Sequence, residues 1–275
     1  MSIEIHGAFA LDEPPCRYGR SRLQCRGPLR RPEPPYFAFL GESETYGKYV
    51  KRPFAALLER DIGQVCINLG ATNAGVDAYL GDDTLLEIAA GATQVVIQAM
   101  GAQNLTNRYY RVHPRRNDRF VAPEPALRQL FPEVDFTEIH FTRHLLAVLA
   151  GVSHRRYLSV AAELRQTWQE RMSALLGILP RPPVLLWLRY DPGGGAWPEP
   201  VLVGQEMVVA LAPALARVIE VPAEPAAVAG EMNAMIYAPA QAAAAARMIG
   251  QGAHYTIAEA LAAALPQAPE SKRPA

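Results

Sequence analysis

Short apolar runs alternate with longer amphipathic segments along most of the chain, and this alternation predicts its fold. Five runs have the length and apolarity of buried strands: residues 36–40, 64–68, 94–100, 184–188 and 217–221. Segments with helical spacing or composition lie between them: residues 54–58, 85–90, 158–178 and 203–215. Strands that alternate with helices predict a parallel sheet with helices on both faces. We therefore expect an α/β fold with three layers, α/β/α.

The remaining segments define the expected domain organisation. Residues 1–35 are rich in Arg and Pro and predict an irregular N-terminal arm. A single domain is expected over residues 36–265, with its last helices over 238–248 and 256–265. Residues 266–275 are expected to be a frayed tail. Residues 105–150 interrupt the alternation, and we expect an insertion over the carboxyl edge of the sheet, where open α/β sheets bind ligands.

Composition and charge narrow the classes of function. Of the 275 residues, 50% are hydrophobic and 20% charged, which is typical of a globular protein with a substantial core. Lys+Arg and Asp+Glu both total 27, so net charge gives no support for binding to nucleic acid. The N-terminus lacks the pattern of a secretory signal, and no apolar run reaches the length of a membrane-spanning helix. A cytoplasmic protein without a membrane partner is expected, and its oligomeric state stays open.

Polar residues follow the predicted strands at four places. Gly-Glu-Ser-Glu-Thr at residues 41–45 follows the first strand, and Asn-Leu-Gly at residues 68–70 follows the second. Gly-Ala-Gln-Asn at residues 101–104 follows the third strand, and His254 lies near the start of the final helix. In this order the blocks resemble those of the SGNH/GDSL hydrolase superfamily. Within it, residues 17–23 and 113–120 resemble an alphaproteobacterial family described as a domain of unknown function.

This resemblance implies a five-stranded, flavodoxin-like SGNH fold and a catalytic serine. Ser43 would attack the carbonyl carbon of an ester, and His254 would accept the Ser43 proton. The N–H groups of Ser43 and Gly70 and the Asn104 side chain would stabilise the oxyanion. The reaction needs no cofactor and no metal. The implied activity is hydrolysis of carboxylic esters, such as the O-acetyl groups of carbohydrates.

The chain departs from the family pattern at Glu42 and Leu105, where the family has Asp, and at the acid position before His254. Gln251 stands where an acid would orient the histidine, so Glu220 or Glu231 would have to replace it, or Ser43 and His254 would act as a pair. The alternative is a catalytically impaired SGNH relative that binds an anionic ligand or a glycan through the Arg-rich insertion.

An arginine cluster follows Asn104 directly. We expect it to bind an acidic group of the substrate near the oxyanion site, because Arg pairs bidentately with carboxylates, phosphates and sulfates. The residues expected to bind substrate are Glu42, Arg108, Arg111, Arg115 and Arg116. The alternative is an insertion held by salt bridges to Asp118, Asp135 and Glu138.

Two further patterns in the sequence do not fit the sites they resemble. Residues 41–48 superficially resemble a phosphate-binding loop, but the spacing is wrong and Tyr49 stands where that loop has Ser or Thr. His140 and His144 have the i, i+4 spacing of zinc ligands, but no third ligand with suitable spacing accompanies them. We therefore expect neither a nucleotide site nor a metal site.

Overall fold

A five-stranded parallel sheet forms the centre of the protein. The computed structural model describes residues 14–193 and 197–265. The strands are β1 (Phe37–Leu40), β2 (Cys66–Asn68), β3 (Gln94–Gln98), β6 (Val184–Arg189) and β7 (Arg217–Pro222). Their order in the sheet is β2-β1-β3-β6-β7, which confirms the flavodoxin-like arrangement. All five lie within or next to the apolar runs of the sequence.

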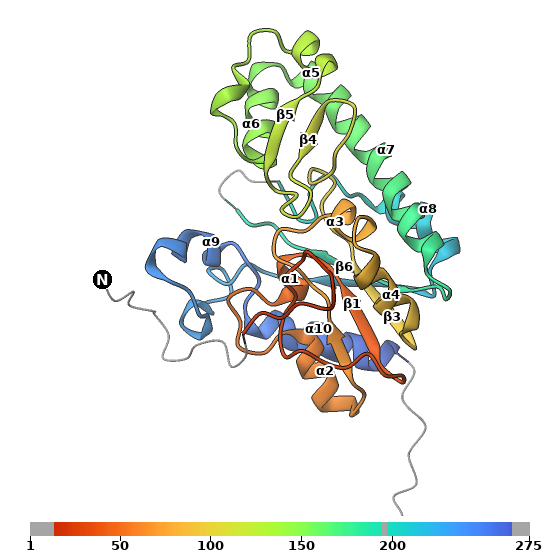
Figure 1. Ribbon diagram of the computed structural model, residues 1–275. Helices are drawn as coiled ribbons and strands as arrows, with labels where there is room; N and C mark the ends of the chain where they lie inside the picture. The colour runs from red at the N-terminus through yellow and green to blue at the C-terminus, as the bar shows by residue number, and fades with distance from the viewer. Residues whose placement is uncertain (1–13, 194–196, 266–275) are drawn as a thin grey trace, which may run out of the picture.

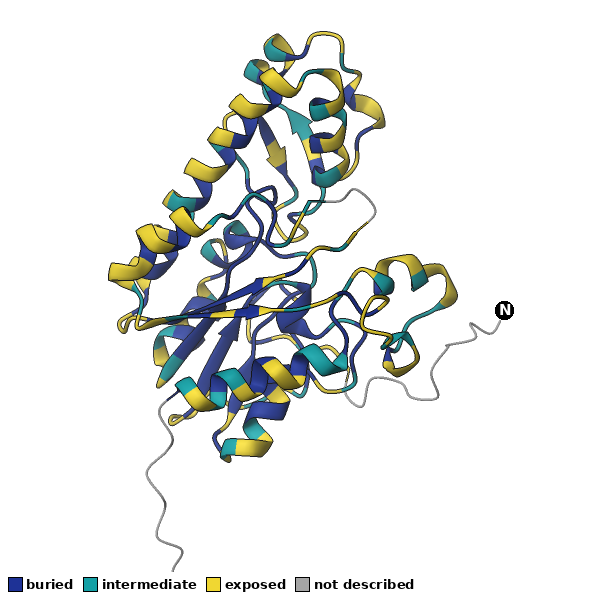
Figure 2. Cartoon of the chain, turned by 180° about the vertical axis from the view of Figure 1, so that it is seen from behind, coloured by how far each residue is buried: buried dark blue, intermediate teal, exposed yellow. Residues whose placement is uncertain are grey.

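Both faces of the sheet are buried along β1, β2, β3 and β6, and for this reason these strands are nearly continuous apolar runs. The edge strand β7 alternates exposed and buried residues instead. Successive side chains of a strand point to opposite faces. Along β1, Ala38 and Leu40 belong to one hydrophobic cluster, while Phe37 and Phe39 belong to the other. Figure 2 shows most of the sheet in the buried colour between helices whose outward sides are exposed.

Helices cover each face of the sheet, which gives the three expected layers (Figure 1). On one face, α2 (Phe54–Ile62) packs against α10 (Gln251–Ala264). The opposite face is covered by α3 (Val76–Leu80), α4 (Asp83–Gly91), α7 (His154–Ile178) and α8 (Gln205–Leu211).

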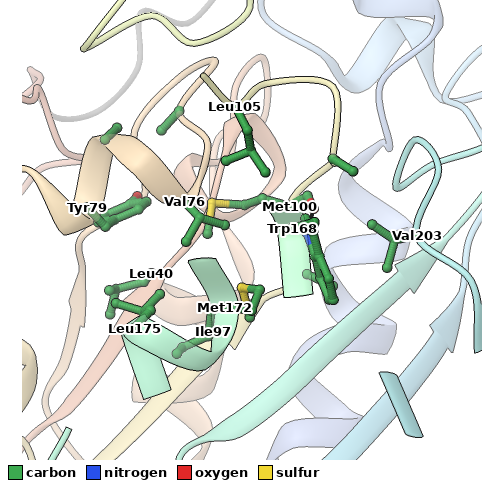
Figure 3. Packing of buried hydrophobic residues seen from close by; sticks show 14 of the residues in the cluster. Leu40, Val76, Tyr79, Ile97, Met100, Leu105, Trp168, Met172, Leu175 and Val203 are labelled. Atoms are coloured by element: carbon green, nitrogen blue, oxygen red, sulfur yellow. Dashed lines mark hydrogen bonds between the residues drawn. The ribbon is translucent and has the colours of Figure 1, made fainter. Parts of the chain in front are cut away.

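The larger core lies between the sheet and α7. Figure 3 shows side chains from two strands and two helices of this cluster packed together: Leu40, Ile97, Val76, Tyr79, Trp168, Met172 and Leu175. Trp168 is fully buried, and its Nε1 donates a hydrogen bond to the Met100 carbonyl oxygen at 2.7 Å. Trp168 therefore fixes the loop after β3 as well as filling the core.

The insertion forms a lobe beside the sheet (Figure 1). It contains an antiparallel hairpin, β4 (Tyr110–Val112) and β5 (Phe120–Pro123), followed by three helical elements. These are α5 (Pro125–Leu130), the 3-10 helix η1 (Phe136–Glu138) and α6 (Thr142–Val152). α6 packs on α7, so the long helix joins the lobe to the sheet.

The N-terminal arm is bound to the domain along its described part. Cys16 and Cys25 form an isolated antiparallel β-bridge through their backbones. Cys25 forms a second β-bridge with Ala71, from the segment after β2. Arg26 is buried and donates hydrogen bonds to the carbonyl oxygens of Gly47 (2.9 Å) and Val50 (3.2 Å). This segment is irregular, as expected, but it contributes to the core.

The helices of the C-terminal third differ in length from the expectation. The helix expected over 203–215 is α8 followed by the 3-10 helix η2 (Ala212–Ala214). The helix expected over 238–248 is reduced to η4 (Pro239–Gln241) and α9 (Ala242–Ala246), after η3 (Met232–Ala234). The last helix begins at Gln251, so it includes His254. The predicted tail, residues 266–275, lies outside the described residues. No described helix is long and apolar enough to cross a membrane.

Candidate functional site: a polar cavity at the strand ends

A cavity of about 580 Å³ lies at the carboxyl ends of the strands, and we call it the Ser43 cavity. Its lining comes from segments after the strands and from the insertion lobe. These residues are Glu42, Ser43, Glu44, Asn73, Gln103, Asn104, Asp118, Phe141, Thr142, Arg143, Tyr190, Pro192, Glu199, Ala244, Arg247 and Met248. Ser43 follows β1 and Asn104 follows β3, so the cavity lies where the strand order reverses, the usual ligand position in such sheets.

Gln98, the last residue of β3, holds the turn that carries Ser43. Its Oε1 accepts hydrogen bonds from the Glu42 N–H at 3.3 Å, the Thr45 N–H at 3.1 Å and Thr45 Oγ1 at 2.5 Å. Its Nε2 donates to Glu44 Oε2 at 3.0 Å. Because Gln98 is buried, water does not replace these bonds. The turn and the short helix α1 (Ser43–Tyr46) are therefore fixed by one side chain.

The Ser43 hydroxyl is hydrogen-bonded to Asn73, which follows β2. The Asn73 N–H donates to Ser43 Oγ at 3.1 Å, and Ser43 Oγ donates to Asn73 Oδ1 at 3.3 Å. Asn73 has a φ of 59°, a left-handed conformation that Asn adopts more readily than most residues. The Ser43 proton is thus directed to an amide oxygen, which is not a base.

The two other expected oxyanion residues have different surroundings. Asn104 lines the cavity, and its Oδ1 accepts a hydrogen bond from Thr142 Oγ1 at 2.9 Å. The Gly70 N–H donates to Asn68 Oδ1 at 2.9 Å, and Gly70 does not line the cavity. A Cβ at position 70 would lie 2.5 Å from the Tyr46 backbone nitrogen. Position 70 therefore requires glycine because the α1 turn is so close, not because a substrate approaches it.

His254 is not brought to Ser43. Its Nδ1 accepts a hydrogen bond from the Phe54 N–H at 3.1 Å, and its ring stacks on Phe54 with centroids 5.7 Å apart. The Phe54 N–H belongs to the first turn of α2, where amides lack partners within the helix, so His254 caps α2. His254 is 1% exposed and does not line the Ser43 cavity. Burial, with a smaller contribution from Arg26, lowers the pKa of His254 to about 3.

This position predicts a pH dependence of stability. His254 is neutral when folded but binds a proton below about pH 6.5 when unfolded, so stability is lost as pH falls from 6.5 towards 3. Between pH 7 and pH 5 the wild type should lose about 2 kcal/mol more of its unfolding free energy than His254→Asn, which keeps an acceptor without this titration. Urea unfolding at both pH values measures the difference. If both proteins lose the same free energy of unfolding between pH 7 and pH 5, His254 does not have this buried, neutral environment.

The residues considered as the acid partner of His254 also lie elsewhere. Gln251 Oε1 accepts from the Arg52 N–H at 3.1 Å, and its Nε2 donates to the Arg52 carbonyl oxygen at 2.8 Å. Glu231 accepts from the Gly252 N–H at 2.8 Å at the start of α10. Glu220 is exposed and pairs with an arginine of β6. None of the three lines the Ser43 cavity, so no Ser–His–acid array is assembled there.

A cluster of carboxyl groups lines the cavity instead. Glu44 Oε1 accepts a hydrogen bond from the Tyr190 hydroxyl at 2.7 Å, and Glu199 pairs with Arg143. Burial, followed by the charges of Glu44 and Glu199, raises the pKa of Glu42 well above its usual range. Burial raises the pKa of Glu199 to about 7, against the opposing effect of Arg143. Perturbed carboxyls in a cavity are typical of functional sites.

Two lining residues have a buried oxygen without a hydrogen-bond donor in the described part of the chain. They are Gln103, through Oε1, and Asp118, through Oδ1. Buried polar atoms in native proteins are nearly always paired with protein, water or ligand. Burial raises the pKa of Asp118, although Arg116 and other cations oppose this. Both residues line the Ser43 cavity, while the two unpaired oxygens themselves are shielded from solvent.

The four arginines expected to bind substrate lie outside the Ser43 cavity. Arg108 Nε lies 3.9 Å from Glu163 Oε2, and Arg111 Nε lies 2.8 Å from Glu124 Oε1. These two arginines thus form salt bridges, but not with the expected partners Asp118, Asp135 and Glu138. Arg115 and Arg116 line a different cavity. Glu42 is the one expected substrate-binding residue that lines the Ser43 cavity.

The histidines considered as zinc ligands form no such site. His140 and His144 are both exposed. Over residues 14–193 and 197–265, no group of three His, Cys, Asp or Glu side chains has the arrangement that a metal ion requires.

Comparisons with known proteins identify a family. A family model described as a domain of unknown function (DUF6473) matches residues 1–269, nearly the whole chain. Searches of the curated proteins and of the solved structures each find no match.

Proposed function

We propose that this chain, which belongs to the DUF6473 family, binds a small carbohydrate-like ligand in the Ser43 cavity without hydrolysing it. The observation that carries the proposal is the pair of unsatisfied oxygens, on Gln103 and Asp118, in a cavity lined by amide, hydroxyl and carboxyl groups. The ligand would be held by an SGNH-like scaffold that lacks the histidine base.

The chemistry of the lining supports a ligand with many hydroxyl groups. Hydroxyls both donate and accept, so they can pair with amide side chains and with carboxyls. Phe141 is 42% exposed at the cavity, and Tyr190 adds a second ring. Ligand sites commonly combine such apolar surfaces with a few polar groups that fix orientation. The volume of about 580 Å³ lies within the range of small-molecule sites.

The protonation of the carboxyls favours a neutral ligand. Burial raises the pKa of Glu42 well above its usual range, which favours the protonated form that can donate a hydrogen bond. Glu199 has a pKa of about 7 and is paired with Arg143. A ligand hydroxyl can therefore meet a donor or an acceptor, and no cation is needed for charge balance.

Binding is tested by titrating the protein with a panel of monosaccharides and their O-acetyl derivatives, followed by ligand-observed NMR and calorimetry. We expect at least one sugar to bind, and Asn73→Gly to weaken it about tenfold, the loss of roughly 1.4 kcal/mol of hydrogen bonding. Glycine keeps the left-handed backbone of Asn73. Gln166→Ala, an exposed change on α7, is the control and should bind as the wild type does. If no sugar of the panel binds at millimolar concentration, the proposal is wrong.

Ester hydrolysis by Ser43 is the second candidate. The observation that favours it is the position of Ser43 after β1, in one cavity with the Asn104 amide and a carboxyl of pKa about 7. In such a reaction Ser43 Oγ would bond to the acyl carbon while a carboxylate accepts its proton. The ester C–O bond would then break, and the alcohol would leave with that proton. Water would hydrolyse the acyl-enzyme, which releases the acid and restores the Ser43 hydroxyl. A fluorophosphonate probe distinguishes the candidates. Labelling of the wild type but not of Ser43→Ala, with turnover of an acetyl ester, would replace the binding proposal by hydrolysis.

A further inference from the structure

A second cavity, of about 390 Å³, is strongly basic. We call it the arginine cavity. Its lining residues come from the N-terminal arm, the segment after β2 and the insertion: Arg17, Arg22, Leu23, Gln24, Ala71, Thr72, His113, Arg115 and Arg116. We propose that the arginine cavity binds a phosphate or sulfate group. This inference does not depend on what occupies the Ser43 cavity.

The charge of the arginine cavity is not compensated by a lining carboxylate. Among the described residues, none of its four arginines forms a salt bridge, whereas Arg108 and Arg111 of the same insertion do. Arg116 interacts with Asp118 only at longer range, through its effect on that pKa. Cations held together without counter-charge repel one another, and an anion relieves this repulsion. Guanidinium groups bind the oxygens of phosphate and sulfate bidentately.

Nearby carboxylates are already used by other groups. Arg22 and Arg115 also border a smaller cavity that contains Asp77 and Asp82. Asp77 accepts hydrogen bonds from Arg171 Nε at 2.9 Å and from a backbone amide. Asp82 accepts from Ser21 Oγ at 2.8 Å and from backbone amides, one of them that of Arg22. Asp82 thus positions the backbone of the arm, and Asp77 is occupied by Arg171 and the Thr106 amide. Neither carboxylate forms a salt bridge with the Arg22 or Arg115 guanidinium.

The backbone on both sides of the arginine cavity is fixed in place. On the insertion side, His113 Nδ1 accepts hydrogen bonds from the N–H groups of Arg115 (3.2 Å) and Arg116 (3.3 Å). The Asn117 N–H donates to the Asn73 carbonyl oxygen at 3.0 Å, which ties this turn to the segment after β2. On the arm side, the pairing of Cys25 with Ala71 holds the arm beside the same segment. The arginines are thus presented by rigid turns, which lowers the entropic cost of binding.

The arginine cavity and the Ser43 cavity are lined by residues that adjoin one another in the chain. Thr72 lines one and Asn73 the other, and Arg116 lines one while Asp118 lines the other. A phosphate or sulfate can therefore belong to a free anion or to a sugar ester whose ring lies in the Ser43 cavity. The chemistry recognised by the arginines is the same in both cases.

The test is calorimetric titration of the full chain with inorganic phosphate and inorganic sulfate, against chloride at equal ionic strength. We expect phosphate or sulfate to bind, and Arg115→Ala and Arg22→Ala each to weaken it about tenfold or more, because a charge-assisted bidentate pair is lost. Arg115→Lys should restore part of the affinity, since it keeps the charge without the planar fork. Arg155→Ala, which removes an exposed arginine of α7 outside this cavity, is the control.

Two results of these titrations would contradict binding of phosphate or sulfate in the arginine cavity. Binding no tighter than that of chloride, or an equal loss in Arg155→Ala and Arg115→Ala, would overturn the proposal by showing non-specific charge effects. Each arginine variant is first checked for unchanged thermal stability in chloride, since exposed arginines without salt bridges should not affect folding. A second titration with glucose and glucose 6-phosphate distinguishes the sources. A free-anion site binds the sugar phosphate no more tightly than phosphate, whereas a site for an ester binds it more tightly than either part.

Discussion

Replacing Gln98 by Met is expected to lower the free energy of unfolding by about 3 kcal/mol or more. Met has a similar volume, so the main effect is the loss of hydrogen bonds to Glu42, Glu44 and Thr45. Each buried polar group left without a partner costs about 1–3 kcal/mol. The turn that carries Ser43 would no longer be held by these hydrogen bonds, so ligand binding in the Ser43 cavity should weaken as well. Urea unfolding followed by circular dichroism measures the first effect.

Gln94→Met is the matched control for this change. Gln94 is the first residue of the same strand, and it is half-buried at the opposite end from the cavity. Its Nε2 donates only to backbone carbonyl oxygens, of Val95 and Pro182. We expect a loss of about 1 kcal/mol at most. If both variants lose the same stability, the Gln98 network does not hold the turn in the way we describe.

The second large effect is expected for Trp168→Ala, which should cost about 3–5 kcal/mol of unfolding free energy. The indole is fully buried between α7 and the sheet, and its N–H holds the Met100 carbonyl oxygen. The change therefore leaves a cavity and an unpaired oxygen at the start of the loop that carries Gln103 and Asn104. Circular dichroism is the suitable probe, because the substitution removes a fluorophore.

Trp168→Phe separates the two contributions. It keeps most of the apolar volume but removes the hydrogen bond to Met100, so we expect a loss of about 1–3 kcal/mol. A Phe variant as unstable as the Ala variant would mean that the hydrogen bond, and not the packing, dominates. A stable Ala variant would contradict the core that Figure 3 shows.

The sheet could be predicted from the sequence because four of its five strands, β1, β2, β3 and β6, are buried along nearly their whole length. β1 and β6 are short apolar runs next to Gly or Pro, and runs of this length and composition are typical of strands in the middle of a parallel sheet. The segment at 238–248 was predicted less well. Its alanines favour a helix, but Pro239 starts only a 3-10 turn and α9 ends at Ala246. Local composition indicates a helix there, and tertiary contacts determine its length.

The part of the candidate site that lies at the ends of the strands could be predicted from the sequence. Ser43 and Asn104 come together because parallel strands end at the same edge of a sheet. His254 was expected beside Ser43 from its order in the chain. Order does not determine which neighbour a helix start faces, and His254 faces Phe54 of α2. The sequence held one indication of this, because Gln251 replaces the acid that a catalytic histidine needs.

The residues that the sequence did not reveal are those whose role depends on distant partners. Gln98 and Asn73 look like ordinary strand-end and turn residues, yet both fix Ser43. Arg143 and Glu199 pair across 56 positions of the chain, through a lobe whose placement no local pattern predicts. Glu199 follows an irregular segment after β6, so neither its burial nor its raised pKa is visible in the sequence.

Helix α7 limits how the insertion lobe can move relative to the sheet. It has 25 residues and, at a rise of roughly 1.5 Å per residue, a length of about 37 Å. It contacts α6 at the lobe end and α3 and α8 over the sheet, and it has no proline; its one glycine, Gly177, lies at the far end. Helices bend sharply mainly at such residues. The lobe is therefore joined to the sheet by a helix without an internal bending point. If the proposed binding function is correct, we expect the Ser43 cavity to keep its shape when the ligand binds.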